Sequence, residues 1–264
     1  MKKMETDHIK ITPEWSQCKE EVWDHVFAKL EDDPRAINIT PRKKTVWFYA
    51  VASIAAVALL IPFIAFFYTK SEVAERGSHL AVILPDRSKV NLNADSKISY
   101  KPLWWFVARD VKLTGEAYFE VEKGSTFNVR SGEYTVSVLG TSFNVFSRAD
   151  KFNVTCLTGK VNVSDKSGGV ILTPNMQALR SDGKLIADII EDANESVNWK
   201  QGKFVFVSVP LQEVIQEIER QYDIEVIRNS TMDYSYSGNF TKTNDPNDVL
   251  KIVGSPFGIE FKIK

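Results

Sequence analysis

The chain has 264 residues, of which 44% are hydrophobic and 25% are charged. This composition is typical of globular proteins and excludes disordered and collagen-like chains. The formal net charge is -1, and nucleic-acid binding requires a concentrated basic surface, so no direct nucleic-acid partner is expected. The length allows one or two folded domains besides any membrane segment.

Residues 1–44 form a tail with one predicted helix, over residues 12–33. Thr12, Pro13 and Glu14 are typical of a helix start, since they supply a hydroxyl cap, a proline at the first helical position and an acid near the positive end of the helix dipole. The helix should end before Pro34. Its apolar residues recur at helical spacing and make one face: Trp15, Cys18, Val22, Val26 and Leu30, widened by Trp23 and Phe27.

This apolar helix face is expected to be buried against another molecule. A single helix cannot bury two tryptophans and a phenylalanine by itself, so another protein, a second copy or lipid should cover them. Residues 12–33 hold seven acids and two lysines, and an acidic helix is repelled by an anionic leaflet. We therefore favour docking into a protein groove, with self-association as the main alternative. The expected contact residues are Trp15, Val22, Trp23, Val26, Phe27 and Leu30.

Residues 45–69 are predicted to form one transmembrane helix. These 25 residues carry no charge, and as a helix they span about 37 Å, more than the roughly 30 Å of a hydrocarbon core. Trp47, Tyr49 and Tyr68 lie near its ends, where aromatic rings favour the membrane interface. Because 44 residues precede the run, we expect a retained anchor rather than a cleaved signal peptide.

The basic residues around this segment predict its orientation. Four of them lie before it and two close behind it: Arg35, Arg42, Lys43 and Lys44, then Lys70 and Arg76. The positive-inside rule then places the N-terminus in the cytosol and the rest in the periplasm. The expectation is a single-pass protein of the inner (cytoplasmic) membrane.

Residues 70–198 are predicted to form an all-β domain. From about His79 to Ile190, apolar residues alternate with polar ones and glycines interrupt the pattern at short intervals. Clear cases are Val111 with Leu113, and Phe143 with Val145. The pattern does not distinguish a sandwich, a barrel or stacked solenoid turns.

Residues 199–264 are predicted to form a small α/β domain. Phe204–Val209 should be a strand, Pro210–Tyr222 a helix and Ile224–Ile227 a second strand. A shift of 35 residues superimposes residues 213–226 of this unit on residues 248–261, which indicates two strand-helix-strand repeats with helices on one side of a sheet. An uncovered edge strand would suit a partner that adds a strand, and a purely structural domain is the alternative.

No catalytic or metal-binding pattern is present, so we expect no enzyme and no cofactor. His8, His25 and His79 lack metal-ligand spacing. The candidate carboxylates Glu116, Glu120 and Glu122 lie on one predicted strand, where we expect them to face solvent. The two cysteines, Cys18 and Cys156, are expected on opposite sides of the membrane, so no intrachain disulfide is expected between them. Each is expected to be a small buried apolar residue.

Four segments of the predicted β-domain carry a specific pattern: Leu84–Ala94 (LPDRSKVNLNA), Leu113–Val121 (LTGEAYFEV), Val138–Val145 (VLGTSFNV) and Leu157–Val161 (LTGKV). In this order they resemble the periplasmic signature of the FecR family of transmembrane anti-sigma factors. The C-terminal repeat resembles the secretin and TonB short N-terminal type of domain. One departure is Arg87, where the family turn usually has glycine.

The resemblance implies a relay across the membrane. Its cytosolic part would hold an extracytoplasmic-function sigma factor, and its periplasmic part would receive a signal from the N-terminal signalling domain of a TonB-dependent outer-membrane transporter. Regulated intramembrane proteolysis commonly completes release in this family. The competing interpretations are a membrane-tethered periplasmic scaffold or glycan-binding module, and an anchored hydrolase, which would need a carboxylate pair in a cleft.

Overall fold

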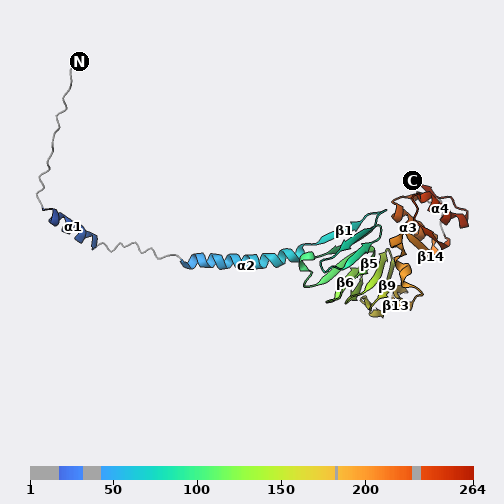
Figure 1. Cartoon of the computed structure of the whole chain (residues 1–264), viewed down its shortest axis with the longest axis horizontal. Coiled ribbons are helices and arrows are strands. Elements are labelled where there is room, and N and C mark those ends of the chain that lie inside the picture. The colour runs from blue at the N-terminus through green and yellow to red at the C-terminus, as the bar shows by residue number, and fades with distance from the viewer. Residues whose placement is uncertain (1–17, 32–42, 182–183, 228–232) are drawn as a thin grey trace, which may run out of the picture. The chain divides into compact units, whose positions relative to one another are not determined.

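The computed structural model describes residues 18–31, 43–181, 184–227 and 233–264 (Figure 1). The chain divides into two compact units, Met1–Ala56 and Val57–Lys264. In the first unit, helix α1 spans Lys19–Glu31. The predicted start of this helix at Thr12, and Trp15 with it, lie outside the described residues.

Helix α2 spans Lys43–Phe67 and carries Pro62 in its interior. Its stretch Val46–Phe67 has 22 residues and is the single helix among the described residues that is long and apolar enough to cross a membrane. At about 1.5 Å per residue it measures about 33 Å. The predicted apolar helix is confirmed, but it ends at Phe67 rather than at Thr69, because strand β1 begins at Lys70.

A large β-domain follows α2, which confirms the prediction of a β-rich region. Its strands are β1 Lys70–Ala74, β2 Leu80–Ile83, β3 Lys89–Leu92, β4 Ser96–Tyr100, β5 Arg109–Glu120, β6 Phe127–Ser131, β7 Tyr134–Val138, β8 Ser142–Arg148, β9 Lys151–Thr158, β10 Val161–Ser164, β11 Gly169–Leu172, β12 Met176–Ser181 and β13 Lys184–Ile189. A 3-10 turn, η1, spans Pro102–Trp104 between β4 and β5.

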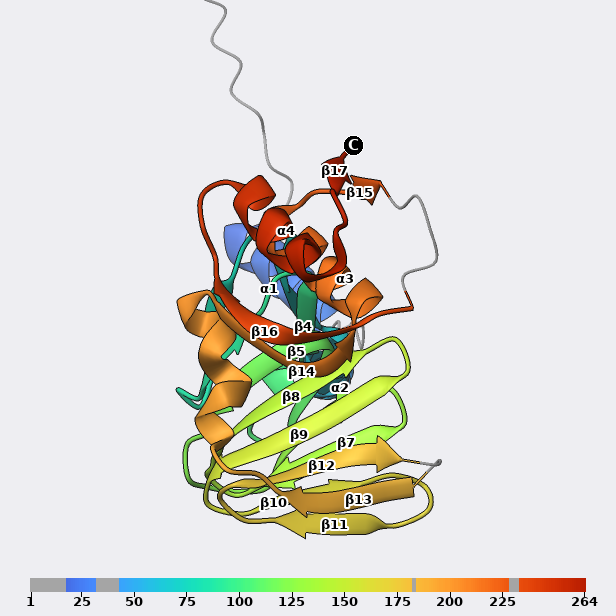
Figure 2. The ribbon, with the colours of Figure 1, turned by 90° about the vertical axis from the view of Figure 1, so that its right-hand side faces the viewer.

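The long strand β5 joins two layers of this domain (Figure 2). One layer has the order β11-β10-β7-β6-β5-β4-β1, and the other has the order β13-β12-β9-β8-β5-β3-β2. Apolar side chains fill the space between the layers: the Phe119 ring lies 5.1 Å from Phe143 and 6.2 Å from Phe127, centroid to centroid. The layers therefore pack face to face as a sandwich, one of the three architectures that the sequence allowed.

Gly115 marks the point where β5 passes from one layer to the other. Its φ is +98°, and a Cβ added there would lie 2.8 Å from Cα of Ser96. Only glycine combines this backbone conformation with so close an approach.

The C-terminal domain contains η2 Ala193–Gln201, β14 Lys203–Pro210, α3 Leu211–Tyr222, β15 Val226–Ile227, β16 Ser235–Thr241, α4 Pro246–Gly254, η3 Ser255–Phe257 and β17 Lys262–Ile263. Strand β14 pairs with β16, and β15 pairs with β17, so there are two small antiparallel sheets rather than the single sheet expected. The expected single sheet is divided because the first strands of the two strand-helix-strand segments, β14 and β16, pair with each other. The short second strands, β15 and β17, likewise pair with each other. The core of the domain joins the two helices through Leu211, Val214, Ile215 and Ile218 of α3 and Val249, Leu250 and Val253 of α4.

Candidate functional site

Helix α1 presents an uncovered aromatic surface. Trp23 and Phe27 are each 52% exposed, and their rings stack with centroids 5.1 Å apart. Val26 is exposed beside them. Every described side chain of the helix is exposed. A stacked pair of this kind offers a preformed apolar anchor to a partner groove.

The predicted tail contacts are described only in part. Trp23, Val26 and Phe27 lie on one face of α1, at positions separated by three or four residues. Val22 and Leu30 belong to the same helix by their backbone, and Trp15 lies outside the described residues. Near the start of the helix, Cys18 is exposed and its Sγ donates a hydrogen bond to Glu20, so the expectation that Cys18 is buried was wrong. Cys156 is buried, as expected.

A second cluster lies where the β-domain meets α3. The carboxylate of Glu116 accepts hydrogen bonds from Nδ2 of Asn93 at 2.7 Å and from Nδ2 of Asn144 at 2.9 Å. All three residues are buried. Each comes from a different family-like segment of the sequence: 84–94, 113–121 and 138–145. These three segments therefore converge on one carboxylate.

Helix α3 extends this cluster into the C-terminal domain. Gln221 is fully buried, and its Nε2 donates to Oδ1 of Asn93 at 2.7 Å and to Oε1 of Glu217 at 2.8 Å. The Gln221 Oε1 lies 3.0 Å from Nε2 of His79. Glu217 also accepts from Nη2 of Arg220 at 2.6 Å. We call these side chains, together with Arg148, the joint: His79, Asn93, Glu116, Asn144, Arg148, Glu217, Arg220 and Gln221.

Backbone contacts reinforce the joint. Arg76 Nη2 donates to the carbonyls of Glu219 and Ile224 at 2.8 and 2.7 Å. The amide of Gly77 donates to the carbonyl of Arg220 at 2.7 Å, and Lys242 Nζ donates to the carbonyl of Gln221. The backbone carbonyls at the end of α3 thus accept hydrogen bonds from the β-domain and from the segment after β16. These bonds fix the helix against the sandwich.

Burial and charge move the pKa values of the joint in opposite directions. Burial raises the pKa of Glu116 to about 7, and the nearby Glu217 adds to this rise. Burial also acts on Glu217, but the charges of Arg220 and Arg148 outweigh it and hold the pKa of Glu217 below its ordinary value. Burial lowers the pKa of His79. Below about pH 7 the arrangement therefore favours a neutral Glu116 next to a charged Glu217.

The sequence did not predict this cluster. Glu116 was expected to face solvent, and that was wrong. Residues 116–119 of β5 are all buried, because one face of this half of β5 packs on the sandwich core and the other is covered by the C-terminal domain. A usable signal was that each of these family-like segments carries a polar residue among apolar ones: Asn93, Glu116 and Asn144. His79, expected at the surface, is exposed, but its ring lies edge-on to Trp199 with centroids 5.2 Å apart.

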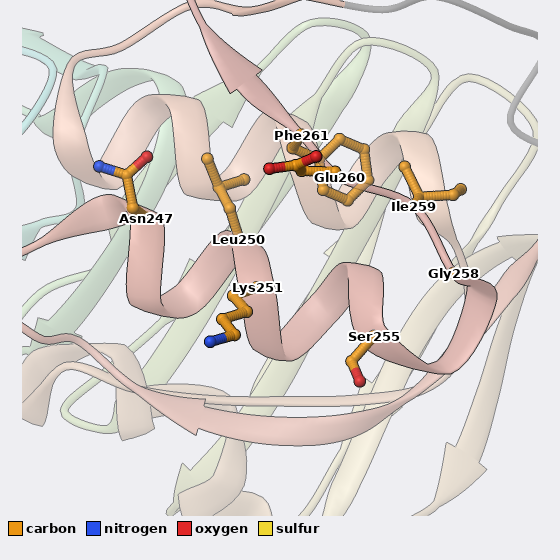
Figure 3. Close-up of a pocket in the computed structure, with 8 residues that line it drawn as sticks. All are labelled: Asn247, Leu250, Lys251, Ser255, Gly258, Ile259, Glu260 and Phe261. Carbon is orange, nitrogen blue, oxygen red and sulfur yellow. The ribbon is translucent and has the colours of Figure 1, made fainter.

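A groove of about 550 Å³ opens between α4 and the chain that leads to β17 (Figure 3). Apolar, polar and charged residues line it together: Asn247, Leu250, Lys251, Ser255, Gly258, Ile259, Glu260 and Phe261. Across residues 18–31, 43–181, 184–227 and 233–264, no group of three or more His, Cys, Asp or Glu side chains is arranged to hold a metal ion.

Comparison with known proteins gives the family. Residues 71–162 match the family described as FecR protein, and residues 203–264 match the one described as FecR, C-terminal. Two crystal structures, each described as a candidate anti-sigma factor from Parabacteroides distasonis ATCC 8503, are 29% and 30% identical to this chain, with TM-scores of 0.68 and 0.67. They cover 75% and 74% of this chain, and 95% of each of them is matched. No curated protein matches the chain. The chain belongs to the FecR family.

Proposed function

We propose that this protein is a membrane-spanning anti-sigma regulator. Its tail binds an extracytoplasmic-function sigma factor in the cytosol, and its C-terminal domain receives a signal from the N-terminal signalling domain of a TonB-dependent outer-membrane transporter. Membership in the FecR family and the likeness to two candidate anti-sigma factors support this proposal. The uncovered Trp23–Phe27 pair is the observation that carries it.

The tail fits a sigma factor by its chemistry. Its aromatic pair is exposed and preformed, and the acids Glu20 and Asp24 lie on the same helix beside it. A partner groove with apolar pockets and a basic rim would match both properties. The six predicted residues, Trp15, Val22, Trp23, Val26, Phe27 and Leu30, make up the proposed contact surface.

Helix α2 supports a place in the inner membrane. One apolar helix of sufficient length precedes the β-domain, and the excess of basic residues before it favours a cytosolic N-terminus and a periplasmic C-terminus. In this arrangement one chain contacts partners on both sides of the membrane. Cleavage within α2 by an intramembrane protease would free the tail with its sigma factor.

The joint supports a relay from the C-terminal domain to the β-domain. A transporter domain bound to the groove beside α4 would act on α3 through the shared core of Leu211, Ile218 and Val249. Helix α3 is in turn bonded to the β-domain through Gln221 and Asn93. A force on the C-terminal domain therefore has a packed path to the sandwich.

The sigma-factor contact can be tested by co-purification. The full chain, solubilised from membranes, is expected to retain the sigma factor, whereas a chain with both Trp23→Ala and Phe27→Ala loses it. Each true anchor contributes about 2 kcal/mol or more, so the double variant should bind at least about a hundredfold more weakly.

The matched control changes the opposite side of the same helix. Glu21→Ala with His25→Ala also removes two exposed side chains, and should leave capture within a few-fold of the native level. Unchanged capture by the Trp23/Phe27 double variant would remove these residues from the contact. Regulation that survives deletion of the tail before Arg42 would favour a tethered scaffold or glycan-binding module instead.

The transporter contact needs a separate experiment. The full chain is titrated with the purified signalling domain of the transporter, and Ile259→Asp is compared with Val207→Asp, a change at an exposed position of β14. We expect the first to weaken binding at least about tenfold, because it puts a charge into the groove. Equal affinities for both variants would exclude the groove as the contact.

A further inference from the structure

An apolar loop of the β-domain lies close to the C-terminal end of helix α2. It comprises residues 101–108, with the sequence KPLWWFVA. Phe106 is 86% exposed, Val107 57% and Leu103 50%. Folded domains rarely expose three large apolar side chains on one short loop, so this loop indicates a surface that is covered in the working protein.

Strand register fixes the loop next to the end of α2. Only Tyr68 and Thr69 separate α2 from β1. Lys70, the first residue of β1, lies directly opposite Tyr100, the last residue of β4, and the loop follows Tyr100 at once. Two linking residues span at most about 11 Å. The loop must therefore stay close to the membrane surface from which α2 emerges.

Side-chain contacts bring the loop to the last turn of α2. The Trp104 ring lies 5.5 Å from the Phe66 ring, centroid to centroid. Lys101 Nζ lies 3.8 Å from the centroid of the same Phe66 ring. A lysine and aromatic rings around the end of a transmembrane helix are the side chains that membrane interfaces favour.

The loop is also rigid enough to present its apolar residues outward. Trp105 points into the sandwich, where it is buried against Tyr100 and Phe127 at 5.6 and 5.8 Å between centroids. Three backbone donors of the loop are satisfied within it: the amide of Trp104 donates to the carbonyl of Lys101, and the amides of Val107 and Ala108 donate to that of Trp104. These bonds lower the cost of moving this part of the backbone into a poorly hydrated region.

We propose that Leu103, Phe106 and Val107 insert into the interfacial region of the bilayer that α2 spans, so that the β-domain rests on the membrane rather than hanging free. Lipid is the occupant because α2 holds the loop beside the bilayer at all times, at a high effective concentration. Lys101 would lie at the level of the lipid phosphates. The inference needs α2 to span a membrane, but it does not depend on the sigma factor, the transporter or the side on which the domain lies.

Depth-dependent fluorescence quenching tests the proposal. The full chain, with Cys18→Ser, carries a single dye at Leu103→Cys and is placed one copy per nanodisc, with nitroxide-labelled phospholipid as the quencher. Cys156 is buried and does not compete for the dye. We expect at least a twofold loss of emission at position 103. A dye at Val207→Cys, 76% exposed in the C-terminal domain, should keep its emission.

A second variant separates lipid contact from mere proximity. Adding Phe106→Asp to the Leu103→Cys chain should restore at least half of the emission, because a charge disfavours insertion, whereas Val207→Asp should not. Circular dichroism melting of each variant checks that the sandwich is intact. No quenching at position 103, or quenching that Phe106→Asp leaves unchanged in a folded chain, would overturn the proposal. Since each disc holds one copy, contact with a second chain would appear as no quenching.

Discussion

Helix α1 and the joint differ in whether their side chains are exposed to solvent or buried in contact with one another. In α1 every described side chain is exposed, including Trp23 and Phe27. In the joint, buried polar groups form hydrogen bonds to one another across two domains. Of the buried side-chain atoms of the joint, two lack a hydrogen-bond partner in the described chain, Asn144 Oδ1 and Arg148 Nε. An exposed apolar surface without contacts in the chain is suited to binding a partner. A buried cluster whose polar groups are hydrogen-bonded is suited to holding two domains in a fixed arrangement.

The largest expected loss comes from breaking the corner beside the joint with Gly115→Ala. The added Cβ would lie 2.8 Å from Cα of Ser96 at a φ of +98°. We expect the free energy of unfolding to fall by about 3 kcal/mol or more, measured by urea denaturation of the full chain in detergent. In Gly132→Ala the φ is +59° but no atom lies within 4 Å, so the loss should be about 1 kcal/mol. Equal losses would show that the approach to Ser96 is not limiting.

The next effect is a pH dependence centred on Glu116. Its pKa is raised from 4.5 to about 7 in the folded chain, so the folded state binds this proton more tightly than the unfolded state. The stability it contributes is fully present below about pH 4.5 and is lost as the pH rises through about 7, by up to about 3 kcal/mol. A protonated Glu116 would also give the unpaired Asn144 Oδ1 a donor after an amide flip.

Glu116→Gln isolates this effect, since glutamine stays neutral and keeps one acceptor. The lowered pKa of Glu217 acts in the opposite sense: its contribution is present above its unfolded pKa and is lost as the pH falls. Because both chains retain Glu217, the difference between them reports Glu116. Between about pH 5 and 8, the native chain should lose stability relative to the variant. A difference that does not change with pH would contradict the raised pKa.

Gln221→Ala cuts the link between the domains with a smaller effect. Asn93 Oδ1 and Glu217 Oε1 would each lose a buried donor, at a cost of about 2 kcal/mol. Gln212→Ala changes an exposed position of the same helix and should stay within about 0.5 kcal/mol of the native chain. Thermal unfolding of both variants in parallel would decide; equal midpoints would mean that Gln221 does not hold the joint.

The smallest predicted effect is a gain, at the turn where the family usually has glycine. Arg87 has a φ of +70°, a conformation that costs a non-glycine residue about 1 kcal/mol or more. Arg87→Gly should therefore raise the free energy of unfolding, by less than about 1 kcal/mol because glycine also gains freedom in the unfolded chain. Lys89→Gly, in the extended strand β3, should lower it. A decrease in both melting midpoints would argue against strain at Arg87.

Local elements could be predicted from the sequence, whereas their pairing could not. Helix α3 begins within one residue of the expected position, and its buried apolar residues Leu211, Val214, Ile215 and Ile218 recur at helical spacing in the sequence. The parallel pairing of β5 with β6 and the passage of β5 through both layers depend on contacts that no local pattern encodes.

The joint was missed for the same reason. In the first half of β5, Val111 and Leu113 alternate with partly or fully exposed residues, as a strand covered on one face should. From Glu116 onward the alternation stops because a second domain covers the other face. Glu116 looks solvent-facing in the sequence, because its partners Asn93 and Asn144 lie on distant segments.

The two-residue link between α2 and β1 also limits how the molecule can move. Tyr68 and Thr69 contribute only about four soft backbone torsions, and the Phe66–Trp104 contact spans them. Because this link has so few free torsions, a tilt or rotation of the sandwich must either bend the link or turn the end of α2. If α2 spans a membrane as proposed, a rotation of the sandwich would therefore be transmitted directly to the end of the helix.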